Sequence, residues 1–304
     1  RIEVPPGELL ELKLVRSDEE WAAGRNYLVH AGDHLRLEPH FDTQNSALEA
    51  NQTLDVGGAI GTLVYDVLLP PSYGEQEGKR YPVLYVQDGQ SLWSHSGDPF
   101  GVWKLETIFD SLYDLEAIEE VIVVGIHAAD GRLEKLSPVK DDENGGGDGP
   151  AFLDAIVDHL RGAIDAKYRT RTGREDTAIL GSSMGGLFAF FAAWARPEVF
   201  GKAICLSSSF WWANRWAVRA AQSKPPKLRP IVYMDSGAAI NPLDKDMNAR
   251  DGFHHTRSMF RAMTSHGFTP GVDLHRLVFS GHTHDAESWS ARVAIPLQLM
   301  FPRA

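Results

Sequence analysis

Residues 176–194 read D-T-A-I-L-G-S-S-M-G-G-L-F-A-F-F-A-A-W, and they decide the fold of the chain. Residues 177–180 are a short apolar run typical of a strand, and the run after the glycines has the composition of a helix. The G-x-S-x-G between them lies on a strand-to-helix turn, the context in which this motif forms a nucleophile elbow. Such a turn needs flanking residues without a Cβ, and the helix start offers free N–H groups to negative charge. We predict that Ser183 is the nucleophile and that Ser182 points away; an ordinary Gly/Ser-rich turn is the alternative.

Strand and helix patterns alternate on both sides of this turn from residue 59 onward. Strand patterns cover residues 61–69, 81–87, 121–127, 202–206, 230–235 and 273–279, and helix patterns cover residues 103–115, 251–267 and 286–300. This alternation predicts an α/β fold, with a mostly parallel central sheet and helices on both faces. In such sheets ligands bind beyond the carboxyl ends of the strands, where the candidate loops of this chain fall.

The N-terminal part of the chain has a different pattern. Residues 8–15 and 35–40 are predicted strands, and no helix is obvious between them. We therefore predict a small β appendage over residues 1–55 and an α/β domain over residues 56–304. Trp21 in the appendage is interpreted as packing on the main domain, and a sugar-stacking platform is the alternative.

The composition disfavours several classes of function. The 30 Lys and Arg residues against 41 Asp and Glu residues give a net charge of −11, which opposes binding to nucleic-acid phosphates or anionic membranes. No apolar run approaches the ~20 residues that a membrane-spanning helix needs. The single cysteine, Cys205, cannot form an intramolecular disulfide. We therefore expect a globular protein with no nucleic-acid partner and no membrane span.

The chain offers two histidines as the base that a serine nucleophile requires. Residues 281–285 after the last predicted strand read G-H-T-H-D, so His282 and His284 both qualify. Half of a zinc site is the alternative for H-x-H, but no second ligand cluster with clear spacing accompanies it. His127, at the end of another predicted strand, is a candidate substrate contact.

The acid that orients the base is expected between Ser and His in chain order. Asp235 lies within the end of a predicted strand, and Asp251 occupies the N-cap position of the predicted helix over residues 251–267. Asp244 and Asp246 lie between them. The residues alone leave these four carboxylates open.

Four motifs in order resemble the esterase D family of α/β-hydrolases, which includes enterochelin (siderophore), feruloyl and acetyl-xylan esterases. They are D-G-Q at 88–90, G-S-S-M-G-G at 181–186, S-S-S-F-W-W at 207–212 and H-D-A-E-S-W at 284–289. The resemblance covers roughly residues 59–302, is nearest to the enterochelin-esterase branch, and implies the α/β-hydrolase fold. In the appendage, K-L-V-R-S-D-E-E-W-A-A-G-R-N at 13–26 resembles later strands of a starch-binding-type carbohydrate module.

The resemblance also implies catalytic roles for individual residues. Ser183 matches the family's nucleophile, and His284 rather than His282 matches its base because Trp289 follows at the family's spacing. The N–H groups of Gln90 and Met184 match the family's oxyanion hole. No cofactor or metal is implied.

The acid departs from the family's pattern. Residues 236–240 read S-G-A-A-I where the family carries G-T-x-D or G-T-x-E, so no carboxylate stands in that place. The D-G-x-x-x-T at the start of the next predicted helix favours Asp251, with Asp246 as the next candidate.

We predict a serine carboxylesterase that acts on a small-molecule or carbohydrate ester. The candidates are a siderophore trilactone and a feruloyl or acetyl ester on a polysaccharide. One alternative is an acyltransferase on the same triad, and another is a catalytically degenerate carbohydrate-binding protein. Four tryptophans are predicted either to wall the substrate site or to lie in the core: Trp93, Trp103, Trp211 and Trp212.

Overall fold

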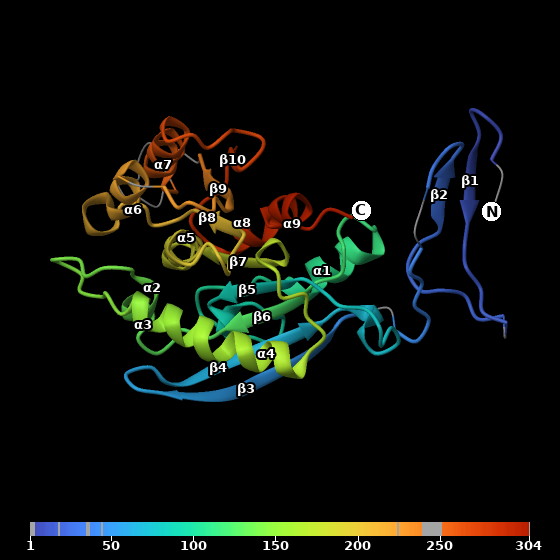
Figure 1. Ribbon diagram of the computed structural model, residues 1–304, viewed down its shortest axis with the longest axis horizontal. Coiled ribbons are helices and arrows are strands. Elements are labelled where there is room, and N and C mark those ends of the chain that lie inside the picture. Colours follow the sequence, from blue (N-terminus) through green and yellow to red (C-terminus); the bar gives the residue numbers. More distant parts are fainter. Residues whose placement is uncertain are drawn as a thin grey trace.

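The computed structural model describes residues 4–17, 19–34, 37–43, 45–223, 225–238 and 251–303 (Figure 1). The strands are β1 (Leu9–Leu12), β2 (Tyr27–His30), β3 (Ala47–Gly57), β4 (Gly61–Leu69), β5 (Val83–Gln87), β6 (Ile122–Ile126), β7 (Thr177–Ser182), β8 (Lys202–Leu206), β9 (Ile231–Gly237) and β10 (Leu274–Phe279). The α-helices are α1 (Leu105–Asp114), α2 (Arg132–Leu136), α3 (Gly149–Asp154), α4 (Arg161–Lys167), α5 (Met184–Ala195), α6 (Trp212–Ser223), α7 (Phe253–Ser265), α8 (Ala286–Arg292) and α9 (Ala294–Met300). Shorter helical segments are η1 (Pro71–Tyr73), η2 (Gly89–Ser91), η3 (Ala155–Leu160) and η4 (Arg174–Asp176).

Within the described residues, eight strands form one sheet in the order β10-β9-β8-β7-β5-β6-β4-β3. Neighbouring strands from β10 to β6 are parallel, whereas β4 runs antiparallel to both β6 and β3. Val83 of β5 is in register with Ile122 of β6 and with Thr177 of β7, so β5 lies between these two strands. In the strand order, β5 and β7 are the two central strands of the sheet. The predicted mostly parallel sheet is confirmed.

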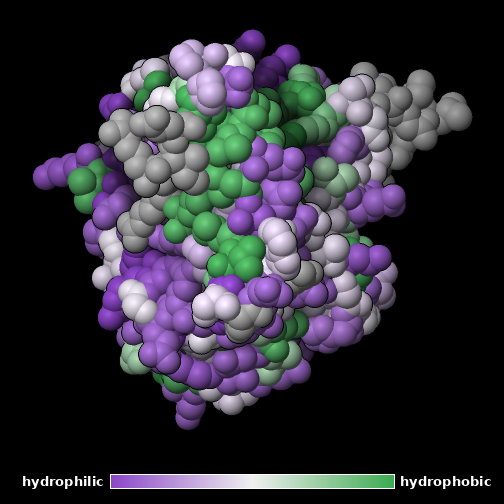
Figure 2. Space-filling view, turned by 90° about the vertical axis from the view of Figure 1, so that its right-hand side faces the viewer, coloured by the Kyte–Doolittle hydropathy of each residue, from purple (hydrophilic) through white to green (hydrophobic). Residues whose placement is uncertain are grey.

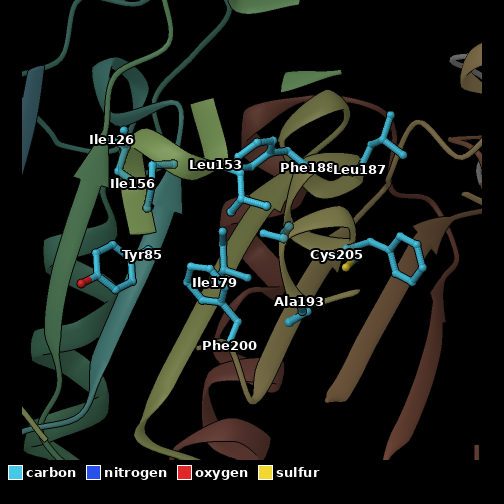
Figure 3. Packing of buried hydrophobic residues seen from close by; sticks show 14 of the residues in the cluster. Tyr85, Ile126, Leu153, Ile156, Ile179, Leu187, Phe188, Ala193, Phe200 and Cys205 are labelled. Atoms are coloured by element: carbon cyan, nitrogen blue, oxygen red, sulfur yellow. The ribbon is translucent and has the colours of Figure 1, made fainter. Parts of the chain in front are cut away.

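Helices cover both faces of this sheet, as predicted. Successive side chains of a strand point to opposite faces, so Tyr85 belongs to one apolar core and Leu84 to the other. On the first face, Phe188 of α5 and Ile156 of η3 lie in the same core as Ile179 of β7 (Figure 3). Helices α1 and α9 supply the second core. Helix α5 is buried on nearly all sides, which explains why its sequence is apolar throughout.

Strand β3 belongs to the main sheet as its edge strand. It pairs antiparallel with β4, from Ala47↔Leu69 to Gly57↔Gly61, and the register shifts between Glu49 and Gln52. Its side chains alternate between exposed and partly buried instead of forming a buried run. The boundary that the sequence predicts near residue 55 therefore falls within β3. The division of the chain into two domains stays a prediction.

Strands β1 and β2 form a separate antiparallel hairpin that stands away from the main body (Figure 1). The strand predicted over residues 8–15 is confirmed for Leu9–Leu12. The strand predicted over residues 35–40 is wrong for residues 37–40, and residues 35 and 36 lie outside the described part. The partner of β1 is instead the nearer segment β2, because Leu9 pairs with His30 and Leu12 with Tyr27.

The hairpin region leaves apolar side chains in solvent. Trp21 is 64% exposed, so the expectation that it packs on the main domain is wrong. It bridges to Val15 instead, and the hairpin stands clear of the sheet. Leu9 and Leu28 are also exposed, and a hydrophobic band crosses this face of the molecule between hydrophilic areas (Figure 2).

The helix predicted over residues 286–300 is divided in the structure. Helix α8 ends at Arg292, and α9 begins at Ala294 with Pro296 in its first turn. A proline has no N–H, and its ring clashes with the carbonyl four residues earlier in a continuous helix. Pro296 therefore separates the two helices at Val293.

The parallel strands bring distant loops to one edge of the sheet. The loops that follow β5, β7 and β10 carry Gln90, Ser183 and His284. Because parallel strands end on the same side, these loops meet beyond the carboxyl ends of the central strands. No helix within the described ranges is long and apolar enough to cross a membrane.

Candidate active site

The turn after β7 holds Ser183 in a strained conformation. Its φ of 55° and ψ of −119° lie in a region that residues with side chains rarely occupy. Its N–H donates to the carbonyl of Leu206 at 3.0 Å and ties the turn to β8. A Cβ at Gly181 would collide with the backbone of Gly185, so strand and helix cross too closely for any other residue. Ser182 is buried at the end of β7, whereas Ser183 stays partly exposed.

A chain of two hydrogen bonds links Ser183 to His284 and Asp251. The Nε2 of His284 lies 2.9 Å from Ser183 Oγ, and its Nδ1 lies 2.7 Å from Asp251 Oδ1. An ionised carboxylate only accepts hydrogen bonds, so Nδ1 carries the proton and Nε2 faces the serine hydroxyl as the acceptor. The imidazole is also held by Trp289, whose ring meets it edge-on at a centroid distance of 5.0 Å. Three residues far apart in sequence thus form one hydrogen-bonded relay, an arrangement in which an imidazole can activate a hydroxyl.

Asp251 is the one of the four candidate carboxylates that contacts His284 within the described residues. Asp244 and Asp246 lie outside them. The expectation that Asp251 caps the following helix is wrong, because Gly252 occupies the N-cap position of α7. The Asp251 backbone has a φ of 42°, which directs its buried carboxylate toward the sheet instead of toward the helix N–H groups.

Behind Asp251 lies a buried polar cluster that the sequence does not predict. The Oδ2 of Asp251 accepts from the Ser207 hydroxyl at 2.6 Å, the Gly237 N–H, and Arg292 Nη2 at 3.3 Å. Arg292 also donates to Asp235, from Nε at 3.0 Å and Nη2 at 3.1 Å. Burial raises the pKa of Asp235 to about 6 in spite of this arginine. Arginine side chains are mostly exposed in proteins, so the residues next to Arg292 in sequence do not predict its buried position.

The two backbone groups predicted as the oxyanion hole lie on neighbouring elements. Met184 is the first residue of α5, so its N–H has no acceptor within the helix. Gln90 lies in η2, directly after β5. This turn packs on the elbow, since a Cβ at Gly185 would lie 3.1 Å from Gln87 Cβ and 3.2 Å from Asp88 Oδ2. The arrangement allows both N–H groups to face one oxygen above Ser183, which stays a prediction.

The turn of residues 88–91 that carries Gln90, called here the oxyanion loop, is flanked by an Arg–Asp ion pair and by an Asp–His hydrogen bond. The Arg132 guanidinium binds Asp88 with both arms, Nε to Oδ1 at 2.6 Å and Nη2 to Oδ2 at 2.8 Å. His127 Nε2 lies 2.7 Å from Asp66 Oδ2, so the candidate substrate contact is engaged by a buried carboxylate. Burial acts to raise the pKa of Asp66, but hydrogen bonds led by that from His127 outweigh it and lower this pKa.

The other histidines lie away from this relay. His282 Nδ1 is 3.2 Å from the Ser288 carbonyl, and its ring meets Phe279 at 5.4 Å. His254 and His255 lie on α7, as the sequence predicts for a helix. Within the described residues, no group of three or more His, Cys, Asp or Glu side chains could hold a metal ion.

The predicted aromatic walls lie mostly in the core. Trp93, Trp103 and Trp212 are at most 3% exposed, and only Trp211 of the four is partly accessible. Trp93 and Trp212 are fixed by their indole N–H groups, which donate to Asp66 at 2.7 Å and to the Val139 carbonyl at 2.8 Å. Of the two roles that the sequence leaves open for these tryptophans, the structure favours the core for three of the four.

The sheet order, the elbow after β7 and the histidine loop after β10 define an α/β-hydrolase fold. The protein family described as "Putative esterase" matches residues 62–294, which is most of the chain. The chain therefore belongs to this esterase family.

The relatives of this chain differ in how much of it they match. The chain is 26% identical to the uncharacterized protein YbbA of Bacillus subtilis over 216 residues, covering 69% of this chain and 81% of that protein. It is 37% identical to a siderophore enterobactin esterase of Emericella nidulans over 176 residues, covering 52% of this chain and 57% of that protein. The structure of a ferulic acid esterase superposes with a TM-score of 0.65 at 18% identity, covering 84% of this chain and 98% of that one. The match to the enterobactin esterase thus spans little more than half of that protein's length.

Proposed function

We propose that the protein is a serine carboxylesterase in which Ser183, His284 and Asp251 form the catalytic triad. The observation that carries this proposal is the unbroken relay from Ser183 Oγ to Asp251 Oδ1, with steps of 2.9 and 2.7 Å through one imidazole. The strained backbone of Ser183 supports the same assignment, because strain of this kind persists where a nucleophile must be presented.

The proposed reaction has two halves. In the first, His284 Nε2 takes the proton of Ser183 Oγ as that oxygen attacks the ester carbonyl carbon. The Gln90 and Met184 N–H groups stabilise the oxyanion, and Asp251 stabilises the imidazolium. His284 then protonates the departing alcohol, which leaves an acyl group on Ser183. In the second half, His284 deprotonates a water that attacks this acyl group. The bond from the acyl carbon to Ser183 Oγ then breaks, His284 returns the proton to Oγ, and the acid is released. No cofactor takes part in these steps.

We propose a siderophore ester as the substrate class. The support is the 37% identity to a siderophore enterobactin esterase, and further relatives are named as esterases of triacetylfusarinine C and salmochelin. A carbohydrate-linked feruloyl ester is the second candidate. It is favoured by a relative from Xylanibacter ruminicola named as an endo-1,4-beta-xylanase/feruloyl esterase, and by the fold match to a ferulic acid esterase.

A substrate panel tests the proposal: p-nitrophenyl acetate, methyl ferulate, acetylated xylan and ferric enterobactin. We expect turnover of p-nitrophenyl acetate and the highest kcat/KM on ferric enterobactin. Labelling of Ser183 by a fluorophosphonate separates the esterase from a degenerate carbohydrate-binding protein, which does not label. Adding a sugar acceptor separates hydrolysis from acyl transfer, because a transferase forms the sugar ester in place of the free acid.

A further inference from the structure

Arg292 is a fully charged side chain buried directly behind the proposed triad acid. It is the last residue of α8, the short helix that follows His284, and it is 1% exposed. Its Nη2 lies 3.3 Å from Asp251 Oδ2 and 3.1 Å from Asp235 Oδ1, and its Nε lies 3.0 Å from Asp235 Oδ2. One guanidinium thus bridges two carboxylates that are both 0% exposed. The mechanism proposed above does not use it.

The charge of this cluster requires a cation. A buried carboxylate is unfavourable unless it is paired, and two neighbouring carboxylates disfavour each other's ionisation. Asp251 must be ionised to stabilise an imidazolium. Arg292 reaches both Asp251 and Asp235, and an arginine does not lose its proton at any working pH.

The hydrogen bonds also fix the direction of the carboxylate. Ser207 Oγ, the Gly237 N–H and Arg292 Nη2 all donate to Oδ2 of Asp251, which leaves Oδ1 for His284. Arg292 further donates to Ser207 Oγ, so it acts on Asp251 both directly and through this hydroxyl. Asp235 in turn anchors the arginine.

Other titratable groups around this cluster do not change charge near neutral pH. Burial raises the pKa of Tyr233, whose hydroxyl donates to Asp235, and burial likewise raises that of Cys205. Burial acts to raise the pKa of Asp285 at the start of α8, but donors led by the Thr283 hydroxyl outweigh it and lower this pKa. Of the shifted groups around Arg292, Asp235 is therefore the one with a pKa, about 6, near neutral pH.

We propose that Arg292 is a positioning residue that keeps Asp251 ionised and aimed at His284, with Asp235 as its anchor. This inference rests on the proposed function. The two acids that the sequence leaves open at 235 and 251 then have different tasks: one orients the histidine, and the other orients the arginine.

Kinetics of Arg292→Met against pH, with p-nitrophenyl acetate as substrate, test the inference. Removing the cation leaves the negative charges of Asp235 and Asp251 unbalanced. This excess negative charge favours protonation of the two carboxylates and of His284. We expect kcat to fall at least ~100-fold at pH 7 with KM little changed, because Arg292 does not face the substrate. The acid limb of the kcat/KM profile should move at least ~1 unit to higher pH.

Three further variants separate positioning from packing. Asp235→Asn removes a negative charge and should move the acid limb to lower pH, the opposite direction. Arg292→Lys keeps the charge and should leave the limb in place. Arg171→Met is the control for loss of a bridging arginine elsewhere, because Arg171 contacts Glu119 at 2.8 Å and Asp176 at 2.7 Å with a side chain that is 36% exposed. It should behave as the unsubstituted protein.

The melting temperature gives a readout that does not need turnover. Carboxyl pKa values raised in the folded state make stability fall as pH rises through them. We expect this fall to extend to higher pH in Arg292→Met than in the unsubstituted protein or Arg171→Met.

An unmoved acid limb in both Arg292→Met and Asp235→Asn would overturn the inference, and so would identical Tm profiles. If Arg292→Met does not fold, the direction in which Asp235→Asn moves the acid limb of the kcat/KM profile tests the inference. Failure of the proposed function looks different: the unsubstituted protein then neither hydrolyses the ester nor labels with a fluorophosphonate.

Discussion

Two Asp–His pairs of the same length lie at the same edge of the sheet. Asp251 and His284 are separated by 2.7 Å, as are Asp66 and His127. The histidine side chains are 22% and 20% exposed, and both carboxylates are buried. The separation and burial of the two pairs alone therefore do not tell which pair serves catalysis.

The difference lies in which imidazole nitrogen meets the carboxylate. His284 uses Nδ1 for Asp251, so its Nε2 points outward to Ser183. His127 uses Nε2 for Asp66, and within the described residues no hydroxyl bonds to its other nitrogen. Asp66 also accepts from Trp93 Nε1 at 2.7 Å. The comparison teaches that a hydroxyl at the far nitrogen, and not the His–Asp contact itself, distinguishes the proposed catalytic pair from the second pair.

The largest expected effect comes from removing the hydroxyl that only the first pair reaches. Ser183→Ala should lower kcat on the order of 10⁶-fold with an unchanged fold, because the attacking group is lost. Ser182→Ala is the control, since that side chain is buried at the end of β7. Steady-state kinetics and circular dichroism measure both. An inactive Ser182→Ala beside an active Ser183→Ala would show that the elbow is displaced by one residue.

Changing the acid of each pair to its amide sharpens the comparison. Asp251→Asn should lower kcat by about 10⁴-fold, because the amide stabilises the wrong imidazole tautomer and no longer balances the imidazolium. Asp66→Asn makes the same change in the second pair and should stay within about 10-fold of the original activity. Asp244→Asn and Asp246→Asn should behave like Asp66→Asn. Full activity of Asp251→Asn would remove it from the triad.

The second pair is expected to act indirectly, by supporting the oxyanion loop. A Cβ on Gly89 would press on the His127 ring and on the backbone of Gly125. Gly89→Ala should therefore displace the adjacent Gln90 N–H and lower kcat by about 10²-fold, close to the loss of one oxyanion donor. KM and fluorophosphonate labelling distinguish a displaced donor from an unfolded protein. Unchanged kcat would argue against Gln90 as an oxyanion donor.

The smallest effect on turnover, and a clear effect on stability, is expected from the charge of Asp66. Its pKa is lowered in the folded state, so the stability it contributes is present above the unfolded value of about 3.8 and is lost as pH falls through the folded value. Asp66→Asn should lower the free energy of unfolding by about 3 kcal/mol at pH 7, and the difference should shrink below about pH 4. Denaturant titrations at pH 7 and pH 3.5 measure it. An equal difference at both pH values would contradict this account.

The sequence by itself determined the class of fold and the place of the elbow. The alternation of strand and helix patterns predicted a mostly parallel sheet with helices on both faces, because the periodicity of side chains is set by local geometry. The glycines around Ser183 predict the tight turn for the same reason, because its steric requirement acts between residues at most five positions apart. The sequence predicts Ser183 and His284 from motifs that each lie within a single loop, and the proposed function assigns their roles.

Only the tertiary structure decided which groups meet. Asp251 lies 33 residues from His284 in sequence, and its contact depends on a backbone φ of 42° that directs it away from its own helix. No sequence pattern predicts the role of Arg292, because the burial of its charge depends on how distant segments pack around α8. The same holds for β3, whose polar edge pattern hides its place in the main sheet, and for Trp21, which is exposed. Sequence patterns report what a residue requires of its neighbours along the chain, whereas the packing of distant loops decides which polar groups share one buried space.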